Sequence, residues 1–233
     1  MSEESGRSLR RAVKAQLDNT VVGIELTLIS IIQGLALGVL ASGSVQPLLA
    51  LQWQVWPYIA AGLVTILIFW SRSLVHTLSF IGWPLEFGHT FIYFGATLIE
   101  AIALSQVADP QRWFALNALY AATVWGLYAY DLRLVHQRAG DFTTPPERAL
   151  LADIVRDQRI NIAFMMPASV AFQALAWWLV HAYPQLMLQR GWHLLLIALT
   201  LVFSLDYLCG GVRLLNRRRN WIVDRNAAAL AED

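Results

Sequence analysis

The chain has 233 residues, of which 57% are hydrophobic and 14% charged, with a net charge of +1 and a mean hydropathy of +0.50. A soluble domain has about 45–50% apolar and about 25% charged residues, so this chain has too little polar surface to cover itself in water. The composition excludes a soluble enzyme, a disordered protein and a nucleic-acid-binding domain, because a nearly neutral chain offers no field for a polyanion.

Six apolar stretches are long enough to cross a membrane, which takes about 20 residues for roughly 30 Å of hydrocarbon. They run over 21–41, 56–75, 85–107, 113–135, 160–180 and 192–215. Turn-forming residues stand between them: Ser42–Gly43–Ser44 with Pro47, Gly82 with Pro84, Asp109–Pro110, Gly140 with Pro145–Pro146, and Pro184 with Gly191. We therefore predict an all-α integral membrane protein, a single domain of six helices paired as three antiparallel hairpins.

The basic residues predict the orientation of these spans. With six spans, the N-terminus, the segments 72–84 and 133–159 and the C-terminus share one side, and they hold 15 of the 17 Lys and Arg. Cytoplasmic segments carry such an excess of basic residues, so we expect both termini in the cytoplasm of a multi-pass protein, and we assign it to a bacterial inner membrane. The apolar run after the basic N-terminal segment is too long for a signal peptide, which predicts a retained first span.

An internal repeat is suggested when the chain is shifted by 60 residues. The second span then falls on the fourth with seven identities in 24 positions, including Leu74–Val75–His76 on Leu134–Val135–His136. The first and third spans match more weakly, and the third hairpin has only short echoes such as Gln173 beside Gln33. The economical interpretation is a pseudo-threefold repeat of a two-helix hairpin; the alternative is convergence of membrane composition.

The segment 137–159 is the longest expected loop, and it contains a helix signal. Thr143–Thr144–Pro145–Pro146–Glu147 is typical of an N-cap followed by Pro in the first turn. Leu150, Leu151, Ile154 and Val155 form one apolar stripe. We predict a short amphipathic helix at the cytoplasmic interface that continues toward the fifth span.

Ionisable and amide side chains inside the spans are the candidate functional residues, because such groups are costly at membrane depth. Glu100 is the sharpest candidate, since its own helix has no basic residue near it. We predict a transport path through the bundle that is made by Glu100, Gln33, Gln173, Asp206, Glu25, Glu86 and Asn117.

A second group of residues has a structural interpretation. Asp131 and Asp206 are expected to pair with Arg133, Arg72 or Arg213 and so to orient the helices. Gly34 and Gly38 form a small-xxx-small motif, which is typical of close helix packing. The same motif and the Trp-rich span ends are compatible with a monomer or with a homo-oligomer. Pro167 is expected to kink the fifth span and to free the carbonyl of Ala163.

Three functions remain open. The first is movement of a small cation or proton, as a channel or carrier, along the predicted path. The second is a non-catalytic membrane subunit or scaffold, in which the same polar groups only fix the packing. The third is a membrane enzyme at the cytoplasmic face, with His76, His89, His136, Glu86 and Asp131 as its site. The sequence predicts no metal or other cofactor, since Cys209 is the single cysteine and the five His are scattered.

Overall fold

The structure, a computed structural model, describes residues 3–79 and 87–231, and for 3–19, 21, 22, 25, 78, 79, 87, 141, 146 and 219–231 it describes only the backbone. Glu86 therefore lies outside the described residues, and so does the side chain of Glu25. In the described part the chain is all-helical, without strands. The α-helices are α1 (Glu3–Leu49), α2 (Trp56–Ser79), α3 (Phe87–Leu104), α4 (Pro110–Gln137), α5 (Pro145–Ile160), α6 (Met166–Ala182) and α7 (His193–Ala231).

Four helical segments are long and apolar enough to cross a membrane, which fits an integral membrane protein. They are Leu26–Leu49, Trp56–Thr77, Glu147–Ala182 and His193–Arg218. The described part of α3 is a shorter apolar helix, Gly88–Leu104. α4 is long, but polar residues and tyrosines along it, among them Asn117 and Asp131, lower its hydropathy.

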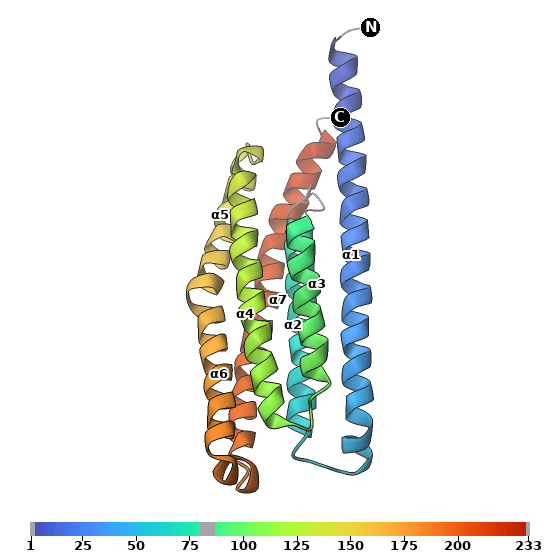
Figure 1. The fold of residues 1–233 in the computed structure, drawn as a ribbon. Helices are drawn as coiled ribbons and strands as arrows, with labels where there is room; N and C mark the ends of the chain where they lie inside the picture. The colour runs from blue at the N-terminus through green and yellow to red at the C-terminus, as the bar shows by residue number, and fades with distance from the viewer. Residues whose placement is uncertain (1–2, 80–86, 232–233) are drawn as a thin grey trace.

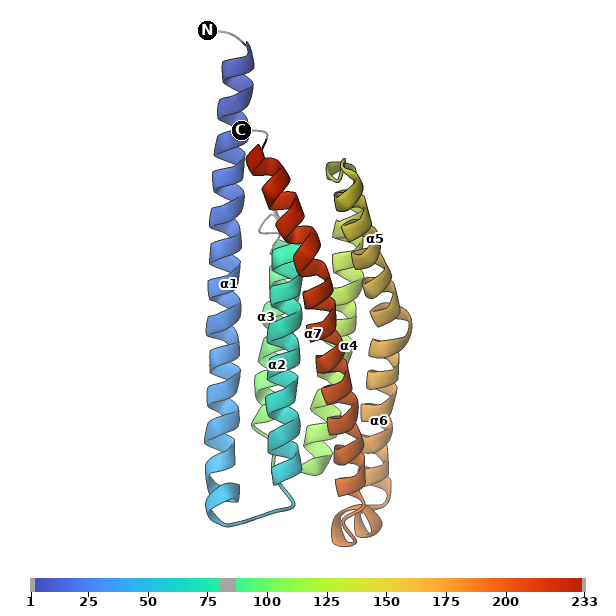
Figure 2. The same cartoon turned by 180° about the vertical axis from the view of Figure 1, so that it is seen from behind.

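The helices run alternately up and down in one bundle (Figure 1). Both termini lie at the same end, which we call the terminal end. The connections 50–55, 105–109 and 183–192 lie at the other end, which we call the far end; Figure 2 shows the same arrangement from behind.

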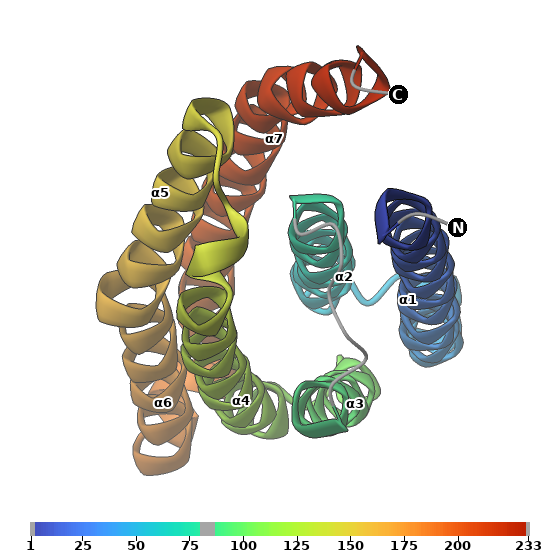
Figure 3. The same cartoon turned by 90° about the horizontal axis from the view of Figure 1, so that it is seen from above.

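Side-by-side packing orders the helices in a ring, seen from the terminal end in Figure 3. On one side α1 packs on α3, α3 on α4 and α4 on α6. On the other side α1 packs on α2 and α2 on α7. The ring closes between α6 and α7, which contact each other only slightly. The α5–α6 segment and α7 therefore do not pack as a hairpin in the way that α3 and α4 do.

The α5–α6 rod contains a π-helical turn, η2 (Asn161–Met165), directly before Pro167. Proline lacks the N–H that would continue the α-helical ladder, and a π-turn frees backbone carbonyls at such a point. The indole of Trp125 donates a hydrogen bond to the carbonyl of Ile162 at 3.0 Å. The sequence predicted a freed carbonyl one residue later, at Ala163.

Two local expectations differ from the structure. α1 continues through Ser42–Gly43–Ser44 and Pro47 to Leu49, because this stretch packs against the end of α3: the position of a Gly43 Cβ is 3.7 Å from the carbonyl oxygen of Leu104. The helix over 145–160 begins as predicted, with the Glu147 carboxylate accepting the backbone N–H of Thr144 at 2.9 Å. It also continues through η2 into α6, toward the fifth span as expected. It differs from the expectation in packing on α4 and α7 within the bundle instead of lying alone at the interface.

Candidate functional site

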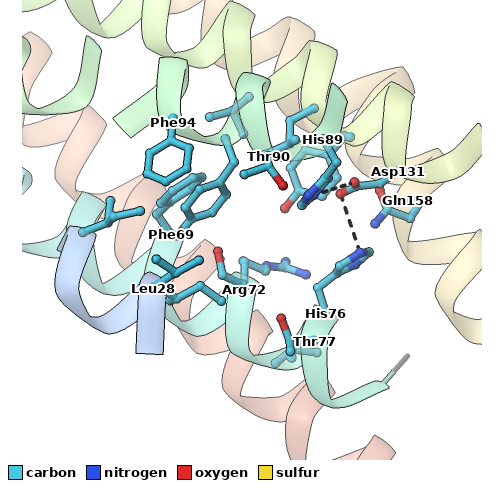
Figure 4. A pocket seen from close by; sticks show the side chains of 18 of the residues that line it. Leu28, Phe69, Arg72, His76, Thr77, His89, Thr90, Phe94, Asp131 and Gln158 are labelled. Carbon is cyan, nitrogen blue, oxygen red and sulfur yellow. Dashed lines mark ion pairs between the residues drawn. The ribbon is translucent and has the colours of Figure 1, made fainter. Parts of the chain in front are cut away.

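A cavity of about 110 Å³ lies at the terminal end, where α1, α2, α3, α4, α5 and α7 converge; we call it the terminal cavity (Figure 4). One wall is apolar and includes Leu28, Phe69 and Phe94, while the other carries charged and polar side chains. The polar wall contains Arg72, His76, Thr77, His89, Thr90, Asp131, Asp157, Gln158 and Arg218.

Two histidines meet one aspartate in this cavity. Nε2 of His89 is 3.1 Å from one carboxylate oxygen of Asp131, and Nε2 of His76 is 3.9 Å from the other. The two imidazole rings are nearly parallel, at 15°, with centroids 6.3 Å apart. Asp131 is buried. The prediction that an arginine pairs with Asp131 is therefore wrong for the described residues, because α4 turns this carboxylate toward α2 and α3, where the histidines lie.

Arginine–aspartate pairs join α2, α5 and α7 beside the histidines. Nη1 of Arg72 is 3.1 Å from Asp157, and its guanidinium carbon lies 4.4 Å from the centre of the Tyr207 ring. Arg218 bridges Asp153 at 2.8 Å and Asp157 at 3.6 Å. The polar face predicted for the helix over 145–160 is thus turned into the bundle, where it holds α5 against its neighbours.

A polar stripe leads from the terminal cavity toward the far end along α3. His89, Tyr93, Thr97 and Glu100 follow at spacings of four, four and three residues, so they share one helix face. Tyr93 and Thr97 are buried. Tyr93 also lines the terminal cavity. The stripe therefore connects the cavity with Glu100 through side chains that face the interior.

Glu100 is buried deeper than any other described acid, with 1% of its surface exposed. Its Oε2 accepts a hydrogen bond from Nε2 of Gln33 at 3.3 Å, across the α1–α3 contact. Its Oε1, the Gln33 Oε1 and the Tyr93 hydroxyl are buried and have no hydrogen-bond partner among the described residues. A carboxylate that is removed from water with one hydrogen bond is most stable when it binds a proton or a cation.

A second, larger cavity of about 420 Å³ lies between α2, α4, α6 and α7; we call it the central cavity. Asn117 in α4 and Gln173 in α6 both line it, and the Gln173 Oε1 has no hydrogen-bond partner in the described part of the chain. Arg72 lines both the central and the terminal cavity. The structure therefore places both predicted amides inside the bundle, but on a different side from the Gln33–Glu100 pair.

Three aromatic rings separate these two polar regions. Phe69 stacks on Tyr93 with ring centroids 5.0 Å apart and meets Tyr120 edge-on at 6.0 Å. Phe69 and Tyr93 line the terminal cavity, whereas Phe69 and Tyr120 line the central cavity. The predicted path over Glu100, Gln33 and Gln173 is thus divided by a layer of rings.

Toward the far end the bundle is closed by apolar packing. Leu40, Leu104, Val107, Trp113 and Phe114 belong to one buried cluster. Within this cluster the hydroxyl of Tyr58 is 2.8 Å from Nδ1 of His193, a buried polar pair that joins α2 to α7.

The remaining predicted residues lie on the outside of the bundle. Asp206, Arg213 and Arg133 are exposed, and no ion pair joins any of them to another described residue. Gly34 and Gly38 have no described atom within 4 Å of an added Cβ, so they mediate no helix packing among the described residues. His136 is exposed as well, with its Nδ1 donating to the carbonyl of Leu132.

Sequence reasoning missed Tyr93, Asp157, Arg218 and the Tyr58–His193 pair. Tyr93 had a usable signal, because it stands seven residues before Glu100 and four after His89 on one face of the same predicted span. Asp157 and Arg218 had none, since the sequence places them on the polar face of an interfacial helix and in a basic segment typical of an anchor to lipid headgroups.

The described residues contain no group of three or more His, Cys, Asp or Glu side chains arranged to hold a metal ion. Comparison with family models, with curated proteins and with solved structures finds no match for this chain. The function must therefore be argued from the site alone.

Proposed function

We propose that this protein carries protons or a small cation across a bacterial inner membrane, through polar groups in the core of a six-span bundle with both termini in the cytoplasm. The six proposed spans are α1, α2, α3, α4, the α5–α6 segment and α7. A pseudo-repeat among them remains a prediction from the sequence. The terminal end is then cytoplasmic, which agrees with the 15 of 17 basic residues in the segments on that side.

The observation that carries the proposal is Glu100. Its carboxylate is 1% exposed and has one described hydrogen bond, to Gln33. A group that only fixed helix packing would gain more from a fully satisfied hydrogen-bond set, since each unmet buried polar atom is costly. Its incomplete coordination fits a group that takes up and releases a proton or a cation.

The terminal cavity supplies the cytoplasmic entrance to this group. His89 and His76 hold Asp131 there, and the face of α3 continues through Tyr93 to Glu100. Imidazole, phenol and carboxylate groups exchange protons readily. Among the described residues, the side of Glu100 toward the far end is apolar instead, and Leu104 and Trp113 there belong to the buried cluster.

The apolar far end favours a carrier over a permanently open channel. An ion cannot cross a dry layer of packed side chains without a large desolvation cost, so release toward the far end requires the helices to move. The slight contact between α6 and α7 marks where the ring is most easily opened.

The test is flux into liposomes that contain the purified chain. Proton entry is measured with a pH-sensitive dye, and sodium and potassium uptake with radioactive tracers, after a pH or membrane-potential step. We expect flux in the parent protein and its loss in Glu100→Gln, which keeps the shape and removes the charge. Asp206→Asn is the matched control and should retain the flux, because Asp206 is exposed. Absence of flux for all three ions in the parent protein overturns the proposal. Normal flux in Glu100→Gln shows that Glu100 takes no part in ion movement.

A second candidate function, a membrane enzyme at the cytoplasmic face, is favoured by one observation: His76, His89 and Asp131 meet in a cavity with an apolar wall. A histidine held by an aspartate can act as a general base. His89→Gln separates the candidates when the parent protein conducts, because it should slow flux if His89 is part of the entrance and leave flux intact if the cluster serves a separate reaction.

A further inference from the structure

A third cavity, of about 470 Å³, opens at the side of the terminal end between the α5–η2 segment and α7; we call it the lateral cavity. Its charged side chains are Arg72, Asp157, Asp206, Arg213 and Arg217. It lies beside the central cavity, with which it shares Arg72 and Tyr207. Neither the transport path nor the histidine cluster uses its exposed residues.

The charges around the lateral cavity do not balance. Arg72 is paired with Asp157, and Arg217 with Asp153 at 2.6 Å, but Arg213 has no ion-pair partner among the described residues. When Asp153 and Arg218 are included, four arginines face three aspartates. One positive charge is therefore in excess around the cavity, although Asp206, which also lines it, has no ion-pair partner among the described residues. Arg213 is exposed and lies outside the arginine–aspartate network.

The surface next to this cavity is apolar toward the far end. Val202 lies on the same face of α7 as Asp206 and Arg213, by spacings of four and seven residues, and it is 66% exposed. On the opposite wall Ile160 lines the cavity, and Phe164, one turn further along, is 69% exposed. The basic opening thus stands directly beside a surface suited to hydrocarbon.

We propose that the lateral cavity is a binding site for one anionic phospholipid of the cytoplasmic leaflet. Its phosphate binds between Arg213 and Arg217, and its acyl chains lie along Val202 and Phe164. The guanidinium fork of arginine matches phosphate oxygens in a two-pronged geometry, and basic pockets between membrane helices at the cytoplasmic side suit such head groups. The inference rests on the proposed orientation of the bundle in the membrane and is independent of ion movement.

Binding there would hold α5 to α7 from the outside. Inside, the same two helices are already joined by Arg217 and Arg218 to Asp153. A phosphate bound there neutralises the excess positive charge and removes repulsion between Arg213 and Arg217 on one face of α7. We therefore expect the lipid to raise the stability of the whole chain.

The experiment is native mass spectrometry of the purified full chain in detergent, with phosphatidylglycerol or the zwitterionic phosphatidylcholine added. We expect phosphatidylglycerol to be retained preferentially, and Arg213→Gln to weaken its retention by about tenfold, the effect of one lost charge-assisted hydrogen bond. Arg133→Gln is the matched control, because Arg133 is exposed at the same end and has no described ion pair. Equal retention of the two lipids, or an equal loss in Arg133→Gln, overturns the proposal.

Two further arms secure the interpretation. Glycerol phosphate is added without lipid; if it raises the thermal unfolding temperature as much as phosphatidylglycerol does, the site takes a soluble phosphate and the lipid assignment is wrong.

Arg213→Lys keeps the charge and should retain more lipid than Arg213→Gln. Circular dichroism of each variant checks that the helices are intact, and unchanged retention in a folded Arg213→Gln variant also contradicts the proposal.

Discussion

Single side chains decide how closely the helices of this bundle approach one another. Gly62 in α2 faces Leu104, Leu40 and Trp113, and a Cβ at its position would lie 2.8 Å from a methyl carbon of Leu104. Gly34 in α1, by contrast, has open space at the same position. The sequence predicted close packing for the glycine that has none, because a small-xxx-small motif does not reveal which helix face meets a neighbour.

These two glycines give a matched pair of substitutions. Gly62→Ala should lower the free energy of unfolding by about 1–3 kcal/mol, since an overpacked core must shift its neighbours. Gly34→Ala should leave it unchanged or raise it by up to about 1 kcal/mol through helix propensity. Unfolding of the purified chain by dodecyl sulfate in mixed micelles measures both values. Equal effects of the two substitutions would contradict the packing described for α2.

Other functional contacts at the residue scale were predictable only in part. Glu100 and Gln33 stand out in the sequence as polar groups within apolar runs, and the structure brings them together although they are 67 positions apart. The partners of Asp131 could not be recognised from the sequence, because Arg133, two residues away, is the nearest cation along the chain. Which charges meet depends on the rotation of α4 about its axis, and that rotation is set by packing on α3 and α6.

At the scale of elements, helix starts were more predictable than helix ends. Asp109 before Pro110 caps α4, with its side chain accepting the backbone N–H of Arg112 at 3.0 Å. Thr144 before Pro145 marks the start of α5, where its backbone N–H donates to the Glu147 carboxylate at 2.9 Å. Such caps are local in sequence. Pro47 did not end α1 where expected, because a proline in the last turn removes a single hydrogen bond that packing against α3 outweighs.

The π-turn η2 is the element that ties the α5–α6 rod to its neighbours. Asn161, 1% exposed, donates through Nδ2 to the carbonyl of Asp157 and accepts a hydrogen bond from the hydroxyl of Tyr207. Tyr207 in turn contacts the hydroxyl of Tyr128 at 2.9 Å. Three helices thus meet at the irregular turn, which lets the extra residue of a π-turn be tolerated there.

This meeting point can be tested with a double-mutant cycle. Asn161→Ala and Tyr207→Phe should each destabilise the chain by about 1–3 kcal/mol, because each leaves a buried polar group unpaired. The double variant should cost less than the sum, with a coupling of about 0.5–3 kcal/mol. Unfolding by dodecyl sulfate again gives the values. Strict additivity would show that the two side chains act independently and that η2 is held by other contacts.

For the whole molecule, the composition and the periodic apolar runs were enough to predict an all-helical membrane protein, because the bilayer constrains length and polarity so strongly. The ring order of the helices was not predictable. Sequence neighbours were expected to pair throughout, yet α6 packs chiefly on α4, and α7 on α2. That order creates the central cavity, and no local sequence pattern predicts such a cavity.

Orientation in the membrane is the prediction that belongs to the whole chain. Gln52 is exposed in the connection at the far end, and Gly140 is exposed at the terminal end. In a Cys209→Ala background, Gln52→Cys should react in intact spheroplasts with a maleimide that cannot cross membranes, whereas Gly140→Cys should react only after permeabilisation. The reason is that the segments of the terminal end hold most of the basic residues, which the membrane potential and the insertion machinery retain in the cytoplasm. The reverse pattern would place the histidine cluster outside and turn the proposed entrance of the path into its exit.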